Sequence, residues 1–262
     1  MAEEQDLELT FWEHLDVLRG SLIRIIGVTV ACGIVAFCFK ETLFDIVLAP
    51  KNSDFITYRL MGVEAFDVHL MNIGLTEQFM IHMKTALVFG LLCASPYVLY
   101  VLYKFIAPAL YQREKRYAGR VVGSAYLMFI VGVLVNYFLI FPLTVRFLGT
   151  YQVSEEVENM LTLQSYMDTM LMMSLVFGIV FEIPVISWLL DVFGLLKAKW
   201  MSQFRRHAIV VILIIAAIIT PTADVFTLTL VSIPIWLLYE ASILIVKATE
   251  RDVEDDDEDE ED

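Results

Sequence analysis

The sequence has few of the residues and motifs on which soluble enzymes depend. Only three cysteines and four histidines occur in 262 residues, their spacings match no zinc-binding pattern, and no His-Glu-x-x-His motif is present. A glycine-rich phosphate-binding loop is also missing, so this chain is not expected to bind a nucleotide as its energy source. No Gly-x-Ser-x-Gly elbow accompanies His82 or Ser174, which argues against an intramembrane hydrolase. We therefore expect no enzyme, catalytic centre, metal site, cofactor or nucleic-acid partner.

The N-terminus lacks the basic segment and apolar core of a secretory signal. Its first twenty residues are acidic and polar, which predicts that no cleavable signal peptide is present. The Arg205-Arg206 pair lies far inside the chain and is interpreted as a determinant of topology.

Hydrophobic residues are abundant and make up 58% of the chain. Apolar runs of roughly 20 residues are typical of membrane-spanning helices. They predict spans at about 22–39, 76–102, 118–142, 166–192, 207–219 and 226–246. The fifth run, 208–219, has only 12 apolar residues, so its helix is expected to thin the bilayer or to tilt less than its neighbours. The predicted fold class is an all-α integral membrane protein with a bundle of six transmembrane helices.

The distribution of lysine and arginine predicts how these spans are oriented. With the N-terminus inside, 13 of the 18 lysines and arginines fall on the cytoplasmic side. The outer side receives four, Lys40, Lys51, Arg59 and Arg146, and Lys84 stays within the second span. Cytoplasmic loops carry an excess of positive residues, so both termini are predicted to be cytoplasmic.

The strong negative charge of the chain belongs to its C-terminal end. The net charge is −14, and ten of the eleven residues in 252–262 are Asp or Glu. We therefore divide the chain into a six-helix transmembrane domain at 1–248 and an acidic, disordered cytoplasmic tail at 249–262. On the outer side, the alternation of apolar and polar residues in 41–50, ending at Pro50, predicts a short helix on the membrane surface.

Ionisable residues within the predicted spans need a physical reason, because a charge in the bilayer is costly. Glu182 precedes Pro184, which removes a backbone hydrogen bond and distorts the preceding turn. We favour a functional cavity at Glu182 over the alternative, a protonated carboxyl bonded to a neighbouring helix. Glu77 and Lys84 are seven residues apart on one helix face. They are expected to pair through an intermediate group, or Lys84 extends towards the outer surface.

The cytoplasmic surface is the other chemically specific region. Glu13, Asp16 and Glu114 lie among cations beside apolar spans, and carboxylates bind guanidinium groups through paired, charge-assisted hydrogen bonds. For any one of them alone, an ordinary solvated surface residue is the better interpretation. Glu114 also has Arg113 next to it as an alternative partner.

Several ordered motifs resemble those of the TatC family, the multi-spanning core of the twin-arginine protein translocase. His14-Leu-Asp-Val-Leu-Arg19 is similar to the N-terminal family motif. Ser95-Pro-Tyr-Val-Leu-Tyr100 and Phe105-Ile-Ala-Pro-Ala-Leu-Tyr111 resemble the second helix and the first cytoplasmic loop. Further matches in order are Thr76-Glu77, Phe141-Pro142-Leu143, Phe181-Glu-Ile-Pro184, Thr220-Pro221 and Asp224-Val-Phe226. The resemblance covers residues 11–246.

This resemblance implies a receptor that exports folded proteins across the bacterial cytoplasmic (inner) membrane, driven by the proton-motive force. Its implied partners are twin-arginine signal peptides, single-span TatA- and TatB-type proteins, further copies of this chain and the lipid bilayer. The implied signal-peptide site contains Glu114, Glu13, Asp16, Arg19 and Arg113. Glu182, Glu77 and Lys84 form the intramembrane polar site, and the residues expected to dock partners or support the structure are Pro50, Phe105, Pro108 and Asp224.

One residue departs from the family motif. The family has a glutamate where this chain has Val17, whose side chain cannot accept a hydrogen bond from a guanidinium group. Asp16 is one residue earlier and points about 100° away on a helix, so the chain is expected to depend more on Glu114. Two other hypotheses stay open: a proton- or ion-coupled secondary transporter with Glu182 as proton carrier, and a structural subunit.

Overall fold

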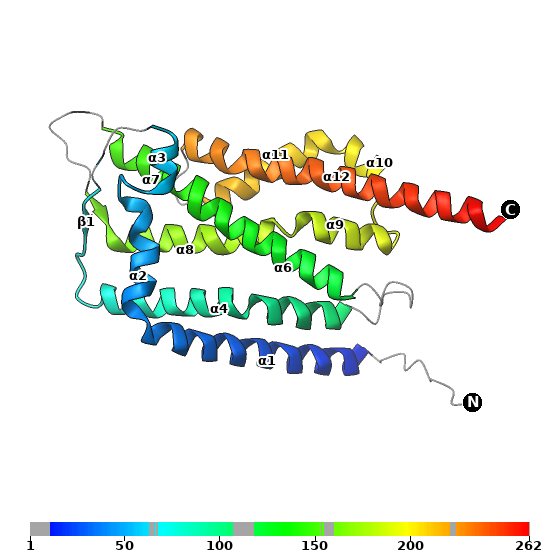
Figure 1. The fold of residues 1–262 in the computed structure, drawn as a ribbon, viewed down its shortest axis with the longest axis horizontal. Helices are drawn as coiled ribbons and strands as arrows, with labels where there is room; N and C mark the ends of the chain where they lie inside the picture. The colour runs from blue at the N-terminus through cyan, green and yellow to red at the C-terminus, as the bar shows by residue number, and fades with distance from the viewer. Residues whose placement is uncertain are drawn as a thin grey trace.

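The chain folds into a bundle of long helices that run side by side (Figure 1). The computed structural model describes residues 11–62, 66, 68–106, 118–152, 154, 160–220 and 224–261. Five stretches within these residues are helical, long enough and apolar enough to cross a membrane. They are Leu15–Cys38, Glu77–Phe105, Val121–Thr150, Leu163–Val192 and Val225–Thr249. The predicted class, a mainly helical membrane protein, is confirmed.

The bundle consists of the longer helices. They are α1 (Phe11–Cys38), α4 (Glu77–Ile106), α6 (Ala118–Val135), α7 (Phe141–Thr150), α8 (Leu163–Val180), α9 (Ile183–Val192), α11 (Arg205–Ile219) and α12 (Val225–Glu261). A π-helical turn, η3 (Asn136–Ile140), joins α6 to α7, and the short α10 (Ala198–Gln203) precedes α11.

The remaining elements lie at one end of the bundle. Helix α2 (Lys40–Leu48), the 3-10 turn η1 (Ala49–Lys51) and α3 (Ile56–Leu60) form a unit that we call the cap. Strands β1 (Leu70–Met71) and β2 (Leu161–Thr162) pair in parallel, with Leu70 opposite Leu161. The cap lies across one end of the long helices, which we call the cap end (Figure 1). Helix α1 begins and α12 ends at the opposite end, the terminal end. The short helix predicted before Pro50 is present as α2, and its location on the outer membrane surface stays a prediction.

Helix α11 corresponds to the predicted fifth span but is too short to be one of the five candidates. Its 15 residues give a length of about 22 Å at 1.5 Å per residue, whereas the hydrocarbon layer is about 30 Å thick. The count of six spans therefore stays a prediction.

The acidic C-terminal segment is drawn as part of a helix. Residues up to Glu261 continue α12, which is 37 residues long, and the disordered tail after residue 248 stays a prediction. Extending an existing helix adds one hydrogen bond per residue without a new nucleation step, although like charges four residues apart oppose this extension. The domain boundary at residue 248 stays a prediction.

Four hydroxyl groups hold the cap against the bundle by binding backbone carbonyls. Tyr137 donates to the carbonyl of Ile46 at 2.7 Å, and Tyr166 donates to that of Val47 at 3.0 Å. These carbonyls belong to the last turn of α2, where few backbone donors remain; that of Ile46 also accepts from the backbone N–H of Ala49. The Tyr58 hydroxyl lies 2.9 Å from the carbonyl oxygens of both Pro50 and Pro142.

The fourth hydroxyl repairs a break that a proline makes in the bundle. Pro142 has no N–H with which to reach the carbonyl of Phe138, four residues earlier, and the helix widens there into η3. The hydroxyl of Thr57 donates to this carbonyl. The next residue, Tyr58, is also a donor. Burial raises the pKa of the Tyr58 phenol above its ordinary value, so this phenol stays protonated and can donate its hydrogen bond. The cap therefore satisfies polar groups that lipid cannot.

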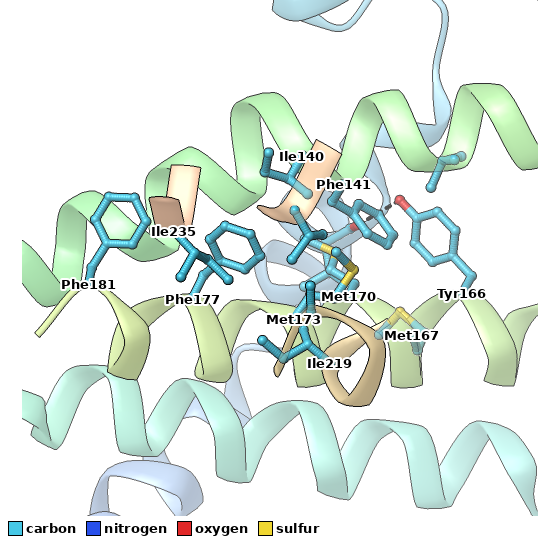
Figure 2. Packing of buried hydrophobic residues seen from close by; sticks show 14 of the residues in the cluster. Ile140, Phe141, Tyr166, Met167, Met170, Met173, Phe177, Phe181, Ile219 and Ile235 are labelled. Atoms are coloured by element: carbon cyan, nitrogen blue, oxygen red, sulfur yellow. Dashed lines mark hydrogen bonds between the residues drawn. The ribbon is translucent and has the colours of Figure 1, made fainter. Parts of the chain in front are cut away.

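The packed core lies between α8 and the segment from η3 to α7, and α11 and α12 contribute to it. Figure 2 shows the residues of this cluster, which include Ile140, Phe141, Tyr166, Met167, Met170, Met173, Phe177, Phe181, Ile219 and Ile235. Helix α1 is the opposite case, because Ile23, Ile26 and Ile34 are more than half exposed. A lipid solvent explains this pattern, since apolar side chains need not be buried in protein there.

Helices α1 and α4 approach each other closely at two glycines. A Cβ atom on Gly90 would lie 2.5 Å from the backbone nitrogen of Gly33 and 2.7 Å from the carbonyl oxygen of Thr29. Small residues allow transmembrane helices to pack backbone against backbone. This contact fixes α4, which lines the groove described below, onto α1.

We expect Gly90→Ala to destabilise the protein by about 1–3 kcal/mol, because the added methyl group meets backbone atoms that cannot move aside. Gly27→Ala is the matched control, since nothing lies within 4 Å of a Cβ atom there and alanine favours the helix by about 1 kcal/mol. Thermal unfolding of the purified variants in detergent, followed by size-exclusion chromatography, measures the difference. Equal stability of the two variants would contradict the close packing.

Candidate functional site

The predicted signal-peptide residues are only partly covered by the structure. Glu114, Arg113 and Pro108 lie outside the described residues, and so does the side chain of Glu13. Asp16 and Arg19 are exposed on the first turns of α1. Phe105 lies in the last turn of α4.

The structure nevertheless places the described parts of the two segments that resemble the family's cytoplasmic motifs, residues 11–19 and 103–106, at the same end of the molecule. Helix α1 begins where α4 ends, and the two helices pack against each other (Figure 1). Residues 11–19 and 103–106 therefore both lie at the terminal end. Val17, at the position of the glutamate in the motif that this segment resembles, exposes 43% of its surface, so an apolar side chain lies on the surface of the terminal end at this position.

Glu182 lies at the break between α8 and α9. Its backbone N–H donates to the carbonyl of Ile179 rather than continuing the α-helical pattern, and Pro184 follows two residues later. The residue is 8% exposed, and its Oε1 atom has no hydrogen-bond partner among the described residues. A buried polar atom without a partner is costly in a native protein, so this carboxyl group is poised for a partner that these residues do not supply.

Glu182 faces a cavity of about 450 Å³ between α4, α6 and the α8–α9 segment. The walls are almost entirely apolar and include Leu91, Phe129, Ile179 and Ile186. Ser95 also lines it, and its hydroxyl donates at 2.7 Å to the carbonyl of Leu92, which Pro96 leaves without its N–H donor. The prediction of a cavity at Glu182 agrees with this geometry.

Lys84 pairs with a residue that the sequence analysis missed. Its Nζ atom lies 2.9 Å from Oδ1 of Asp168 on α8, and the two side chains are 48% and 41% exposed. The sequence led us to expect that Lys84 pairs with Glu77 through an intermediate group or extends towards the outer surface. In the structure Lys84 binds Asp168, and Oε2 of Glu77 accepts a hydrogen bond from the backbone N–H of Ile73 at 3.2 Å. Asp168 falls within the predicted fourth span, so the rule that singled out Glu182 was sufficient to find it.

The ion pair lines a second cavity of about 710 Å³, towards the cap end. Its lining includes Thr169, Gln164 and Ile219, the last residue of the short α11. Leu175 lines both this cavity and the one at Glu182. We call the two cavities together the α4–α8 groove. Polar groups therefore occur at two levels of a groove whose walls are otherwise mainly apolar.

Other predicted residues have structural contacts. Pro50 is a buried residue of the cap, and its carbonyl accepts a hydrogen bond from Tyr58 of the same unit. Asp224 accepts from the backbone N–H of Thr227 at 2.7 Å through Oδ1, which caps the start of α12. A further contact, which the sequence did not indicate, joins Asn136 Nδ2 to Ser174 Oγ at 2.9 Å in the core.

Potential metal ligands are dispersed in the part of the chain that the structure describes. There, no three His, Cys, Asp or Glu side chains come together in a way that could hold a metal ion. The three cysteines are free thiols.

A double-mutant cycle tests the ion pair. We expect Lys84→Met and Asp168→Leu each to lower the thermal stability, because each leaves an unpaired charge at membrane depth. The double variant should recover part of the loss, with a coupling energy of about 1 kcal/mol. Thermal unfolding in one lipid–detergent mixture measures all four proteins. Strictly additive losses would show that the two side chains do not interact.

Comparison with known proteins provides the family of the chain. The family described as Sec-independent protein translocase protein (TatC) matches residues 13–234. A TatC protein of Koribacter versatilis is 35% identical over 244 residues, which cover 93% of this chain and 87% of that protein. A TatC protein of Aquifex aeolicus is 34% identical over 241 residues, covering 91% and 95%.

A solved structure extends this similarity to three dimensions. The crystal structure of a twin-arginine translocase receptor TatC is 34% identical, superimposes with a TM-score of 0.76, and covers 90% of this chain and 98% of that one. The fold, the order of the motifs and the relatives agree. The chain belongs to the TatC family of Sec-independent protein translocase proteins.

Proposed function

We propose that this chain is the receptor for twin-arginine signal peptides and the core of a translocase that exports folded proteins. The observation that carries the proposal is the common location of residues 11–19 and 103–106 at the terminal end of a TatC-family protein. The relatives described above are translocase proteins, so they lend no support to the alternative of a proton- or ion-coupled secondary transporter. The chain is a component of a translocase, and we expect no enzymatic activity of its own.

In this proposal the protein has six spans in the bacterial cytoplasmic (inner) membrane, and α11 is the fifth. The terminal end faces the cytoplasm, with both termini there, and the cap end faces outwards. The excess of lysine and arginine in the predicted cytoplasmic segments supports this orientation. The short α11 crosses only where the bilayer is thinned.

Glu114 is the main acceptor for the guanidinium groups of the signal, and Glu13 or Asp16 assists it. Arg113 and Arg19 offset part of the negative charge of these carboxylates. The terminal end therefore does not bind every positively charged segment, and recognition depends on the geometry of the guanidinium groups. A carboxylate binds guanidinium through two parallel hydrogen bonds and binds an ammonium group with less geometric specificity. This difference accounts for a preference for arginine over lysine.

The apolar part of the signal then enters the α4–α8 groove. Its walls are mainly apolar, and it extends from the level of Glu182 to that of the Lys84–Asp168 pair. TatA- and TatB-type helices dock on the bundle when the proton-motive force is present, and several copies of this chain assemble in the receptor complex. Four residues support these contacts by shaping the terminal end and the cap end: Phe105, Pro108, Pro50 and Asp224.

Photocrosslinking in membranes tests the receptor site. A benzophenone amino acid placed beside the arginines of a twin-arginine signal should crosslink to residues 11–19 and 103–116. Glu114→Ala should reduce the yield about tenfold or more, because a charge-assisted hydrogen-bond pair is lost. A Lys-Lys signal should have a similar effect.

Asp54→Ala is the matched control, because Asp54 is an exposed carboxylate near the cap and is not expected to change the yield. Absence of any crosslink to the intact chain would refute the receptor. An undiminished crosslink in Glu114→Ala would leave the receptor intact but assign the guanidinium contact to another residue.

Two substitutions of Glu182 distinguish a role in hydrogen bonding from a role in proton transfer. If Glu182 binds a polar group of a helix in the groove, Glu182→Gln should keep export within about twofold, whereas Glu182→Leu should lower it about tenfold. Export of a folded reporter at matched protein levels measures both. Complete loss of export in Glu182→Gln would instead favour proton transfer through this carboxyl group.

A further inference from the structure

A third cavity lies at the cap end, on the side of the molecule where α2 meets α4. Its volume is about 440 Å³, and it is lined by Lys40, Phe44, Leu48, Gln78, Phe79, His82 and Leu163. It shares no lining residue with the α4–α8 groove. The proposed signal-peptide path therefore does not use it.

His82 is the unusual member of this lining. It is 8% exposed, and its Nε2 atom is buried without a hydrogen-bond partner among the described residues. The imidazole ring stacks on Phe37 with ring centres 4.0 Å apart and meets the edge of Phe44 at 5.6 Å. These aromatic neighbours hold the ring in place but offer Nε2 no hydrogen bond. A buried imidazole of this kind needs a hydrogen-bonding ligand.

The N-terminus of α2 adds positive charge at the same cavity. This helix has nine residues, and its N-cap residue, Phe39, provides no side-chain hydrogen bond. The first N–H groups of such a helix favour an anion, since the helix dipole is positive there. Lys40 is the first residue of α2 and lines the cavity. An ammonium group, an amide from Gln78 and an imidazole together favour a phosphate oxygen over a carbonyl or a cation.

The cavity also lies at the edge of the apolar layer. The candidate span of α1 ends at Cys38, two residues before Lys40, and that of α4 begins at Glu77, one residue before Gln78. Phe79 is 59% exposed and forms part of the apolar side of the lining, with Leu48 and Leu163. A ligand here meets polar groups at one end and hydrocarbon at the other, which is the pattern of a phospholipid.

We propose that this cavity binds one phospholipid of the leaflet at the cap end. Its phosphate lies between Lys40, Gln78 and His82, and an acyl chain packs along Phe44 and Phe79. Glu41, an exposed carboxylate next to Lys40, favours a headgroup that carries an ammonium group, so phosphatidylethanolamine is the appropriate probe. The site does not depend on the proposed receptor function.

Native mass spectrometry of the delipidated, full-length protein tests the site. We expect phosphatidylethanolamine to bind about tenfold more weakly to His82→Phe and to Lys40→Gln than to the unmodified protein. His82→Phe keeps the ring that stacks on Phe37 and removes only the nitrogens. Lys51→Gln, on η1 outside the cavity lining, is the matched control and should bind the lipid as the unmodified protein does.

Two further ligands distinguish the source of the phosphate. Diacylglycerol has the acyl chains without the phosphate, and inorganic phosphate has the charge without the chains; both should bind more weakly than the phospholipid. Equal binding of diacylglycerol, equal binding of inorganic phosphate, or unchanged lipid affinity in both cavity variants would each overturn the proposal. Circular dichroism and size-exclusion chromatography check folding, and Lys40→Gln at an exposed position carries the test alone if His82→Phe is misfolded.

Discussion

The constraint on which the structure depends is that every backbone carbonyl at membrane depth needs a donor from the protein itself. Prolines break this rule locally, and hydroxyl groups restore it. Ser95 binds the carbonyl that Pro96 leaves free, and Thr57 binds the one that Pro142 leaves free. The second repair comes from the cap, so the cap is needed to complete the bundle and is more than a covering loop.

The same constraint positions the polar sites. A proline interrupts α8 at Glu182, which brings a carboxyl group into a cavity with almost entirely apolar walls. Tyr137 and Tyr166 bind the end of α2 from the bundle, and this fixes the start of α2 beside His82. The cavity at Glu182 therefore lies at interrupted helices, and the cavity at His82 lies beside a helix whose end is held by hydroxyl groups of the bundle.

Sequence patterns predicted the features of the fold that depend on a single helix. Hydrophobic runs predicted the five long spans, and alternation before Pro50 predicted α2. Pairing between elements was not predictable in this way. Lys84 was expected to pair with Glu77 on its own helix through an intermediate group or to extend towards the outer surface, and the packing of α4 against α8 instead brings Asp168 to it at 2.9 Å. A one-dimensional pattern shows which residues are costly in lipid and does not show which partners offset that cost.

The three cavities differ in the kind of occupant that they fit. The groove at Glu182 and Lys84 has polar groups at two levels within long apolar walls, which suits a helix that carries an occasional polar residue. The cavity at His82 has its polar groups at one end, where the apolar spans stop, which suits an amphiphile anchored by its headgroup. A lipid held there would pack against α2 and α4 without entering the groove. The proposed signal-peptide site and the proposed lipid site therefore occupy separate cavities that share no lining residue, and only the cavity at His82 is lined by residues of the cap.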